Sequence, residues 1–165
     1  MAVLASERRV SRLEVFRRAD ELRDVMVDLM QRNFGIRDSY LRMRPKYVHG
    51  QAVTFDEWSK RMERLNRAKR QVDELSLAVP NLLRAANSIT PVVRLEYEER
   101  RLKQTMACEA CEEMKKILMI LCGEFDLDVN MLRIPIQKLD NEIALIRRWR
   151  QKDNRLAAKT GAAST

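Results

Sequence analysis

The chain has 165 residues, the usual size of one domain, and it is long enough to bury a core without disulfide bonds or metal ions. Hydrophobic residues make up 45% of the chain and charged residues 34%, while glycine and proline number only four each, a composition that favours long helices and gives little support to a β fold. The formal net charge of +8 indicates an anionic partner, either nucleic acid, an acidic protein or anionic lipid.

The first predicted helix covers residues 10–31. Ser11 and Glu14 fit the S-x-x-E capping box that begins many helices, and Gly35 is a suitable stop because glycine tolerates the left-handed conformation that follows a helix. The buried face is predicted from apolar residues three or four positions apart, which are Leu13, Phe16, Ala19, Leu22, Met26 and Leu29.

Residues 36–53 contain a proline and a glycine and have no sustained hydrophobic period, so we expect an irregular connection there. The second helix is predicted to begin near Thr54, because Glu57 three residues later completes another capping box. Pro80 predicts a kink or a break, since proline removes a helical hydrogen bond. One long apolar stripe defines this helix: Phe55, Trp58, Met62, Leu65, Ala68, Val72, Leu75, Val79, Leu82, Ala86 and Ile89.

The third predicted helix begins at Thr90 and Pro91, which fit an N-cap followed by proline at the first helical position. It runs to about Leu121, and Gly123 is the expected terminator. Its predicted buried face consists of Leu95, Leu102, Met106, Ala110, Met114, Ile117 and Leu121.

A short connection over residues 126–130 leads to the fourth predicted helix. Pro135 must then lie in the first turn, or the helix must start just before it, because a proline further inside disrupts the helix. After Ala157 no apolar pattern continues. The apolar stripe of this helix consists of Leu132, Ile136, Leu139, Ile143 and Ile146.

These patterns together predict an all-α protein, a four-helix bundle of long antiparallel helices with an irregular segment after the first helix. The bundle is expected to form a single domain over residues 1–156, and residues 157–165 to form a disordered C-terminal tail. No run of about twenty apolar residues exists, and the apolar run at the N-terminus is too short for a secretory signal. Three cysteines fit a reducing compartment, so we expect a cytoplasmic protein with no membrane partner.

Two groups of basic residues are the candidate binding sites for nucleic acid. The C-terminal basic group consists of Arg147, Arg148, Arg150, Lys152 and Arg155, with Trp149 among them. The connection basic group consists of Arg37, Arg42, Arg44 and Lys46, with Tyr40 and Tyr47 nearby. Basic side chains neutralise phosphates, and aromatic rings stack on unpaired bases. The alternative is that Trp149 completes the apolar stripe and the arginines only solvate the end of the helix.

Sites for catalysis or for a cofactor are scarce in the sequence. Cys108 and Cys111 form a C-x-x-C pattern, but on a helix they share a face, where small apolar cysteines pack well, and ligands of suitable type are lacking. The chain has one histidine, His49, which we expect in a loop with a solvent or backbone partner. No Gly-rich phosphate loop, nucleophile elbow or H-E-x-x-H pattern occurs. We therefore expect no enzymatic activity, no catalytic residue, no metal site and no cofactor.

Two segments carry a resemblance to a known family. They are residues 82–91, Leu-Leu-Arg-Ala-Ala-Asn-Ser-Ile-Thr-Pro, and residues 139–155, in which Asp140, Glu142, Ile143, Ile146 and Trp149 match the pattern of the family's last helix. In these segments the chain resembles the accessory variability determinant family of diversity-generating retroelements. That family is similar in fold to the four-helix proteins encoded by ribosomal RNA intervening sequences. Where the family has Gly-Gly before the tryptophan, this chain has Arg147-Arg148.

The resemblance implies a non-enzymatic accessory protein of a reverse transcriptase. Members of the family assemble as ring-like pentamers and offer a basic surface to nucleic acid and to the polymerase. By resemblance, the partners would be the reverse transcriptase, its template RNA and the cDNA, and further copies of this chain. Two other classes stay open on the residues alone: a helical adaptor whose basic face binds an acidic protein, and a small redox or metal protein that uses Cys108 and Cys111.

Overall fold

The computed structural model describes residues 2–159, with side chains described from residue 14 onward. This part of the chain contains five α-helices, a 3-10 turn and one two-stranded hairpin, which confirms the prediction of a mostly helical protein. In chain order the elements are α1 (Ala2–Gln31), the 3-10 turn η1 (Asn33–Gly35), α2 (Asp38–Arg42), β1 (Tyr47–Val48), β2 (Gln51–Ala52), α3 (Phe55–Ser88), α4 (Arg94–Glu124) and α5 (Asn130–Lys159).

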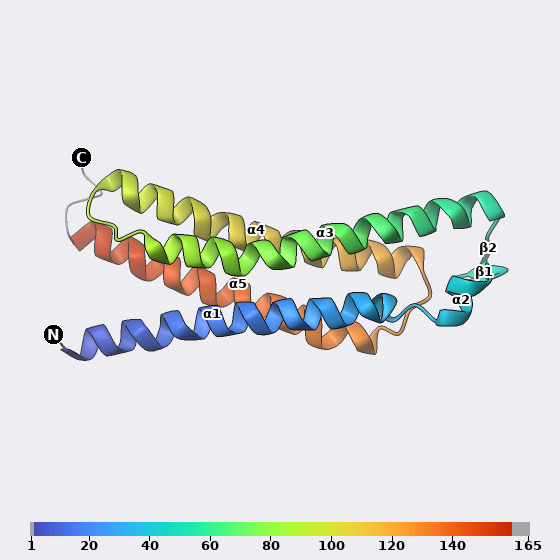
Figure 1. The fold of residues 1–165 in the computed structure, drawn as a ribbon, viewed down its shortest axis with the longest axis horizontal. Coiled ribbons are helices and arrows are strands. Elements are labelled where there is room, and N and C mark those ends of the chain that lie inside the picture. The colour runs from blue at the N-terminus through green and yellow to red at the C-terminus, as the bar shows by residue number, and fades with distance from the viewer. Residues whose placement is uncertain (1, 160–165) are drawn as a thin grey trace.

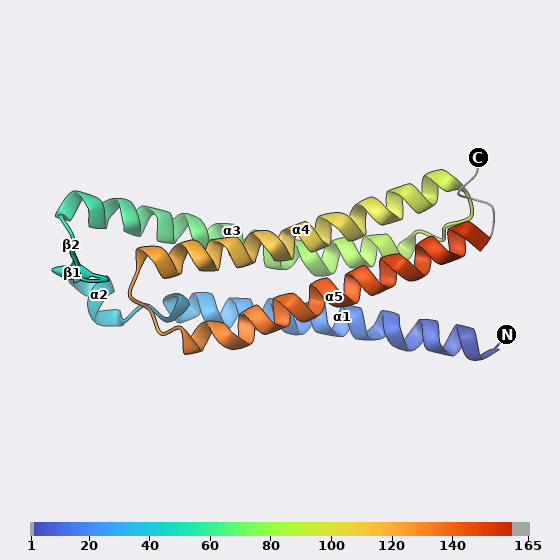
Figure 2. The same cartoon turned by 180° about the vertical axis from the view of Figure 1, so that it is seen from behind.

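The four long helices α1, α3, α4 and α5 lie side by side in an elongated molecule, and successive long helices run in opposite directions (Figures 1 and 2). Helix α3 packs against α1 and α4, and α5 packs against the same two helices. The small elements α2, β1 and β2 occupy one end, called the hairpin end below. The start of α1, the α3–α4 connection and the end of α5 lie at the opposite end (Figure 1). Among the helices of the described residues, none is both long and apolar enough to cross a membrane.

Helix α1 ends as expected but begins earlier. Its first residue is Ala2, so the capping box predicted at Ser11 lies inside the helix and that prediction is wrong. After Gln31 the chain turns through η1 to Gly35, whose φ of +82° is a conformation that favours glycine. The carbonyl oxygen of Gly35 accepts a hydrogen bond from the N–H of Asp128 at 3.1 Å, which ties the end of α1 to the α4–α5 connection.

The segment predicted to be irregular contains α2 and the hairpin. Strands β1 and β2 pair antiparallel with Val48 opposite Gln51, and His49 and Gly50 form the two-residue turn. Both turn residues have positive φ, 50° and 75°, as the favoured hairpin turns require. Two-residue strands are too short to show a period of two in the sequence, which explains why the hairpin was not predicted.

Helix α3 begins with the predicted capping box. The backbone N–H of Thr54 donates to the Glu57 carboxylate at 2.9 Å, and the N–H of Glu57 donates to the Thr54 hydroxyl at 3.2 Å. The helix then continues through Pro80 to Ser88, so of the two predicted outcomes, a kink or a break, the break is wrong. Pro80 is buried, and packing of α3 against α1 and α4 on both sides of it compensates for the lost hydrogen bond. Phe55, expected in the stripe, is exposed.

Helix α4 begins at Arg94 rather than at Pro91. The Glu96 carboxylate accepts the backbone N–H groups of Val92 and Val93, at 2.7 and 3.1 Å, and so stabilises this start. Gly123 lies inside the helix, which ends at Glu124. The second half of the predicted face is correct, since its four members are buried: Ala110, Met114, Ile117 and Leu121.

The first half of the predicted α4 face is wrong. Leu95, Leu102 and Met106 are 74%, 58% and 44% exposed. Arg100 and Gln104 are buried in their place. Two polar residues occupy the inner side because they meet a buried acidic residue of α5, which is described below.

Helix α5 begins at Asn130, so Pro135 lies in its second turn rather than its first. The predicted stripe is confirmed, with Leu132, Leu139, Ile143 and Ile146 buried. The helix continues to Lys159, so residues 157–159 are helical and not part of a disordered tail. Residues 160–165, the rest of the predicted tail, lie outside the described residues.

Candidate nucleic-acid interface

The C-terminal basic group is divided between two sides of α5. Arg147 pairs with Glu112 of α4 at 2.8 Å, and Arg150 donates a hydrogen bond to the hydroxyl of Thr105, also of α4, at 3.1 Å. These two cations are therefore engaged in the contact between α4 and α5.

The other three cations face the opposite side. Arg148, Lys152 and Arg155 are spaced four and three residues apart, so they share one face of α5, and all three are exposed. No described residue forms an ion pair with any of them. They line a cavity between α5 and α1, called the α1–α5 pocket below. Its lining residues are Glu14, Val15, Leu145, Arg148, Trp149, Gln151, Lys152 and Arg155.

Trp149 belongs to the core, which decides between the two readings of this residue. Its side chain is only 6% exposed. Its ring packs edge to face with the ring of Phe16, with ring centroids 6.0 Å apart and planes at 88°. The Arg100 guanidinium lies 4.9 Å from the centroid of the indole ring. The indole is thus held between α1 and α4, and its faces are not available to stack on a base.

Asp153 is the partner that holds Arg100 inside the molecule. Its carboxylate accepts two hydrogen bonds from the Arg100 guanidinium, at 2.8 and 3.2 Å, and one from the amide of Gln104 at 2.9 Å. A third donor of Arg100 reaches the carbonyl oxygen of Ile89 at 3.0 Å. The apolar pattern of the sequence did not predict this network. The available signal was the position of Asp153, four residues after Trp149 on the buried stripe of α5.

Glu142 is a second buried acid whose burial the sequence pattern did not predict. It is fully buried on α5, and neither carboxylate oxygen has a hydrogen-bond partner among the described residues. Burial raises the pKa of Glu142 to about 8, against the lowering effect of Arg18 on α1. The carboxyl group is therefore mainly protonated at neutral pH.

The connection basic group lies at the hairpin end, far from the C-terminal basic group (Figure 1). Arg44 donates a hydrogen bond to the carbonyl oxygen of Val53 at 3.0 Å, and so helps to close the hairpin. Arg42 and Lys46 are exposed. The structure thus places the two basic groups at opposite ends and does not bring them together.

The cysteines and the histidine have structural surroundings. Cys108 and Cys111 are buried in the core, as expected for packing residues, and burial raises the pKa of both thiols. Within residues 14–159 no group of three or more His, Cys, Asp or Glu side chains is arranged to hold a metal ion. His49 attaches the hairpin to the end of α4. Its ring nitrogens lie 2.8 Å from the Asp126 carboxylate and 3.0 Å from the carbonyl oxygen of Cys122.

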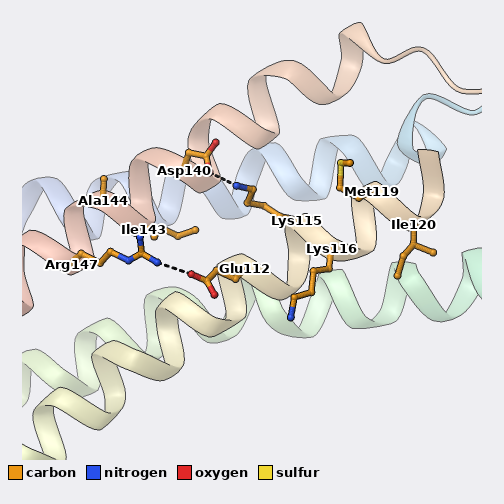
Figure 3. Close-up of a pocket in the computed structure, with 9 residues that line it drawn as sticks. All are labelled: Glu112, Lys115, Lys116, Met119, Ile120, Asp140, Ile143, Ala144 and Arg147. Carbon is orange, nitrogen blue, oxygen red and sulfur yellow. Dashed lines mark hydrogen bonds and ion pairs between the residues drawn. The ribbon is translucent and has the colours of Figure 1, made fainter. Parts of the chain in front are cut away.

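A largely apolar groove, called the α4–α5 groove below, runs along the surface between α4 and α5 (Figure 3). Two ion pairs cross it, Lys115 with Asp140 and Arg147 with Glu112. Met119 and Ile120 are exposed along its α4 side. Its lining residues are Glu112, Lys115, Lys116, Met119, Ile120, Asp140, Ile143, Ala144 and Arg147.

Comparison of the chain with protein-family models, with curated proteins and with solved structures found no match. The family resemblance therefore rests on the residues of segments 82–91 and 139–155 alone.

Proposed function

We propose that this chain is a non-enzymatic nucleic-acid-binding accessory protein, which associates with a reverse transcriptase and its template RNA in the cytoplasm and supports cDNA synthesis in a diversity-generating retroelement. The observation that carries the nucleic-acid part is the exposed face of α5, where three cations are exposed and no described residue pairs with them. The polymerase part rests on the resemblance of segments 82–91 and 139–155. We further infer that the four long helices form one antiparallel four-helix bundle.

Homo-oligomerisation is part of the proposal, with five subunits by resemblance. It is supported by two exposed apolar surfaces on different parts of the chain. The first is the α4–α5 groove, and the second is an apolar ridge on the first half of α4, made of Leu95, Leu102 and Met106. Apolar surfaces of this kind on one subunit are typical of protein–protein contacts. A ridge that enters the groove of the next copy is a head-to-tail contact, which closes into a ring when the rotation permits.

RNA binding can be tested at the two ends of the molecule with matched triple variants. Arg148→Gln, Lys152→Gln and Arg155→Gln remove three charges from α5, and Arg42→Gln, Arg44→Gln and Lys46→Gln remove three charges from the hairpin end. Each phosphate contact on a single strand contributes about −0.7 to the slope of log affinity against log salt concentration. We expect the α5 variant to reduce the magnitude of this slope by about two, and the hairpin-end variant to reduce it less.

The measurement is binding of a fluorescently labelled single-stranded RNA at two salt concentrations. Equal slopes in the native protein and in the α5 variant would exclude this face as the binding site. Absence of salt-sensitive RNA binding in the native protein would contradict the proposed function and favour the alternative, a helical adaptor for an acidic protein.

A further inference from the structure

We propose that the α1–α5 pocket is a specific site for one phosphate group, held by Arg148, Lys152 and Arg155 beside the indole ring of Trp149. This inference deepens the proposed function and rests on it for the source of the phosphate, the backbone of a nucleic acid. It separates these three residues from Arg147 and Arg150, which are engaged with α4.

The first support is the convergence of charge on one cavity. Arg148, Lys152 and Arg155 line the pocket together, and Glu14 of α1 is the one acid among the lining residues whose side chains are described, residues 14–159. The described part of the lining therefore carries a formal charge of +2, three cations less one carboxylate. Arginine and lysine are the side chains that bind phosphate most often, through charge-assisted hydrogen bonds.

The second support is the fixed position of the indole ring. Phe16 packs against the ring edge-to-face, and Arg100 lies over the ring. Arg100 is itself fixed and neutralised by Asp153, so it positions the ring and leaves the binding charge to the three exposed cations. A pocket wall held in place before binding loses little entropy when the ligand arrives, and this makes the site more favourable than a surface of mobile side chains.

The pocket also contains a carboxylate that competes with phosphate for the three cations. The Glu14 carboxylate lines the pocket and forms a long ion pair with Arg18, at 3.9 Å. Its negative charge opposes binding of an anion. Glu14→Gln should therefore raise the affinity for phosphate, in the opposite direction to the loss of any of the cations.

The experiment observes the two indole N–H signals in the proton–nitrogen spectrum of the full chain while inorganic phosphate is added, at an ionic strength held constant with chloride. We expect the Trp149 signal to shift and saturate. Trp58, on α3 and in contact with Phe125, serves as an internal control whose signal should stay in place. A variant with Trp58→Phe assigns the two signals.

Two double variants of equal charge test whether the pocket cations, and not the cations that contact α4, bind phosphate. Arg148→Gln with Lys152→Gln should weaken phosphate binding by about tenfold or more, because two charge-assisted hydrogen bonds are lost. Arg147→Gln with Arg150→Gln should change it by less than about twofold, since these residues lie outside the pocket. Arg147, Arg148 and Lys152 are exposed and Arg150 is half-buried, and circular dichroism tests whether the variants stay folded. Linear drift of both indole signals, or equal weakening in both variants, would overturn the proposal.

A second titration with a short single-stranded RNA separates this inference from the proposed function. If the RNA shifts the Trp149 signal and competes with inorganic phosphate, the pocket binds the polymer backbone. If phosphate binds and RNA does not, the pocket is a site for free phosphate and the proposed function fails. If RNA binds equally well to both double variants while phosphate leaves the Trp149 signal unchanged, the pocket proposal fails and the proposed function stands.

Discussion

Two buried acids, Asp153 and Glu142, interrupt the apolar inner face of α5, and each is accommodated in a different way. Asp153 is neutralised by Arg100 and Gln104, whereas Glu142 has no partner among the described residues and is accommodated as a neutral carboxylic acid. Sequence patterns predicted the apolar members of this face correctly but not these two acids. The reason is physical: the partner of Asp153 lies 53 residues away on another helix, and the burial of Glu142 depends on how closely α1 packs against α5.

Glu142→Gln should make the protein more stable at high pH. The pKa of Glu142 is about 8 in the folded chain, against an ordinary value of 4.5. The folded state therefore holds a proton that the unfolded state loses above about pH 4.5, so the stability of the native protein falls as pH rises from 4.5 towards 8. Glutamine carries no such penalty. We expect the variant to gain about 3–5 kcal/mol relative to the native protein between pH 4 and pH 8.5.

Urea unfolding of both proteins at pH 4, 6 and 8.5 measures this difference. Glu109→Gln, at an exposed position of α4, is the control and should change the free energy of unfolding by less than about 0.5 kcal/mol at each pH. A difference between Glu142→Gln and the native protein that is the same at all three pH values would contradict a buried, protonated Glu142.

At the scale of elements, local signals predicted some helix boundaries and failed at others. The capping box at Thr54 is observed, because both of its hydrogen bonds are formed within three residues. The start of α4 is also set locally, by Glu96 reaching back to Val92 and Val93, but it was not predicted because the N-cap residue Val93 has no side chain that can cap a helix. The hairpin depends instead on contacts of His49 with the distant Asp126. The rotation of α4 that exposes Leu102 follows from the polar contacts of Arg100 with α5. Boundaries set by such distant contacts cannot be recovered from local sequence.

Gly35→Ala should destabilise the chain at the turn between α1 and α2. Gly35 has a φ of +82°, and an added Cβ would lie 3.2 Å from the sulfur of Met131 and 3.3 Å from the carbonyl oxygen of Asp128. The left-handed conformation alone costs a residue with a Cβ roughly 1–2 kcal/mol. The close approach to α5 adds to this cost, so we expect a loss of about 2 kcal/mol.

Gly123→Ala is the matched control, because Gly123 lies inside α4 and nothing is within 4 Å of its added Cβ. The same change there should stabilise the helix by about 0.5–1 kcal/mol. Chemical unfolding of both variants gives the comparison. Changes of the same sign at the two positions would show that the conformation of Gly35 does not limit the substitution.

At the scale of the whole molecule, the two basic groups lie apart from each other, and the exposed apolar surfaces lie on α4 and α5. The C-terminal basic group and the connection basic group lie at opposite ends, so these two groups do not come together on one face (Figure 1). The apolar ridge and the α4–α5 groove lie on α4 and α5. Sequence composition predicted the net charge of +8 but not this separation, because the order of the helices in space decides which residues become neighbours.

If the apolar ridge of one copy enters the α4–α5 groove of the next, Leu102→Lys should disrupt the assembly. Leu102 is exposed at the centre of the ridge, so its replacement leaves the fold of the single chain unchanged but places a charge in a desolvated contact, which is unfavourable. Light scattering should give a mass several times the monomer mass of 19.4 kDa for the native protein and a mass close to 19.4 kDa for the variant. Leu77→Lys, at an exposed position of α3 outside both the ridge and the groove, is the control and should keep the native mass. A native protein that is monomeric at micromolar concentration would contradict homo-oligomerisation, whereas an oligomer that persists in Leu102→Lys would place the contact elsewhere on the molecule.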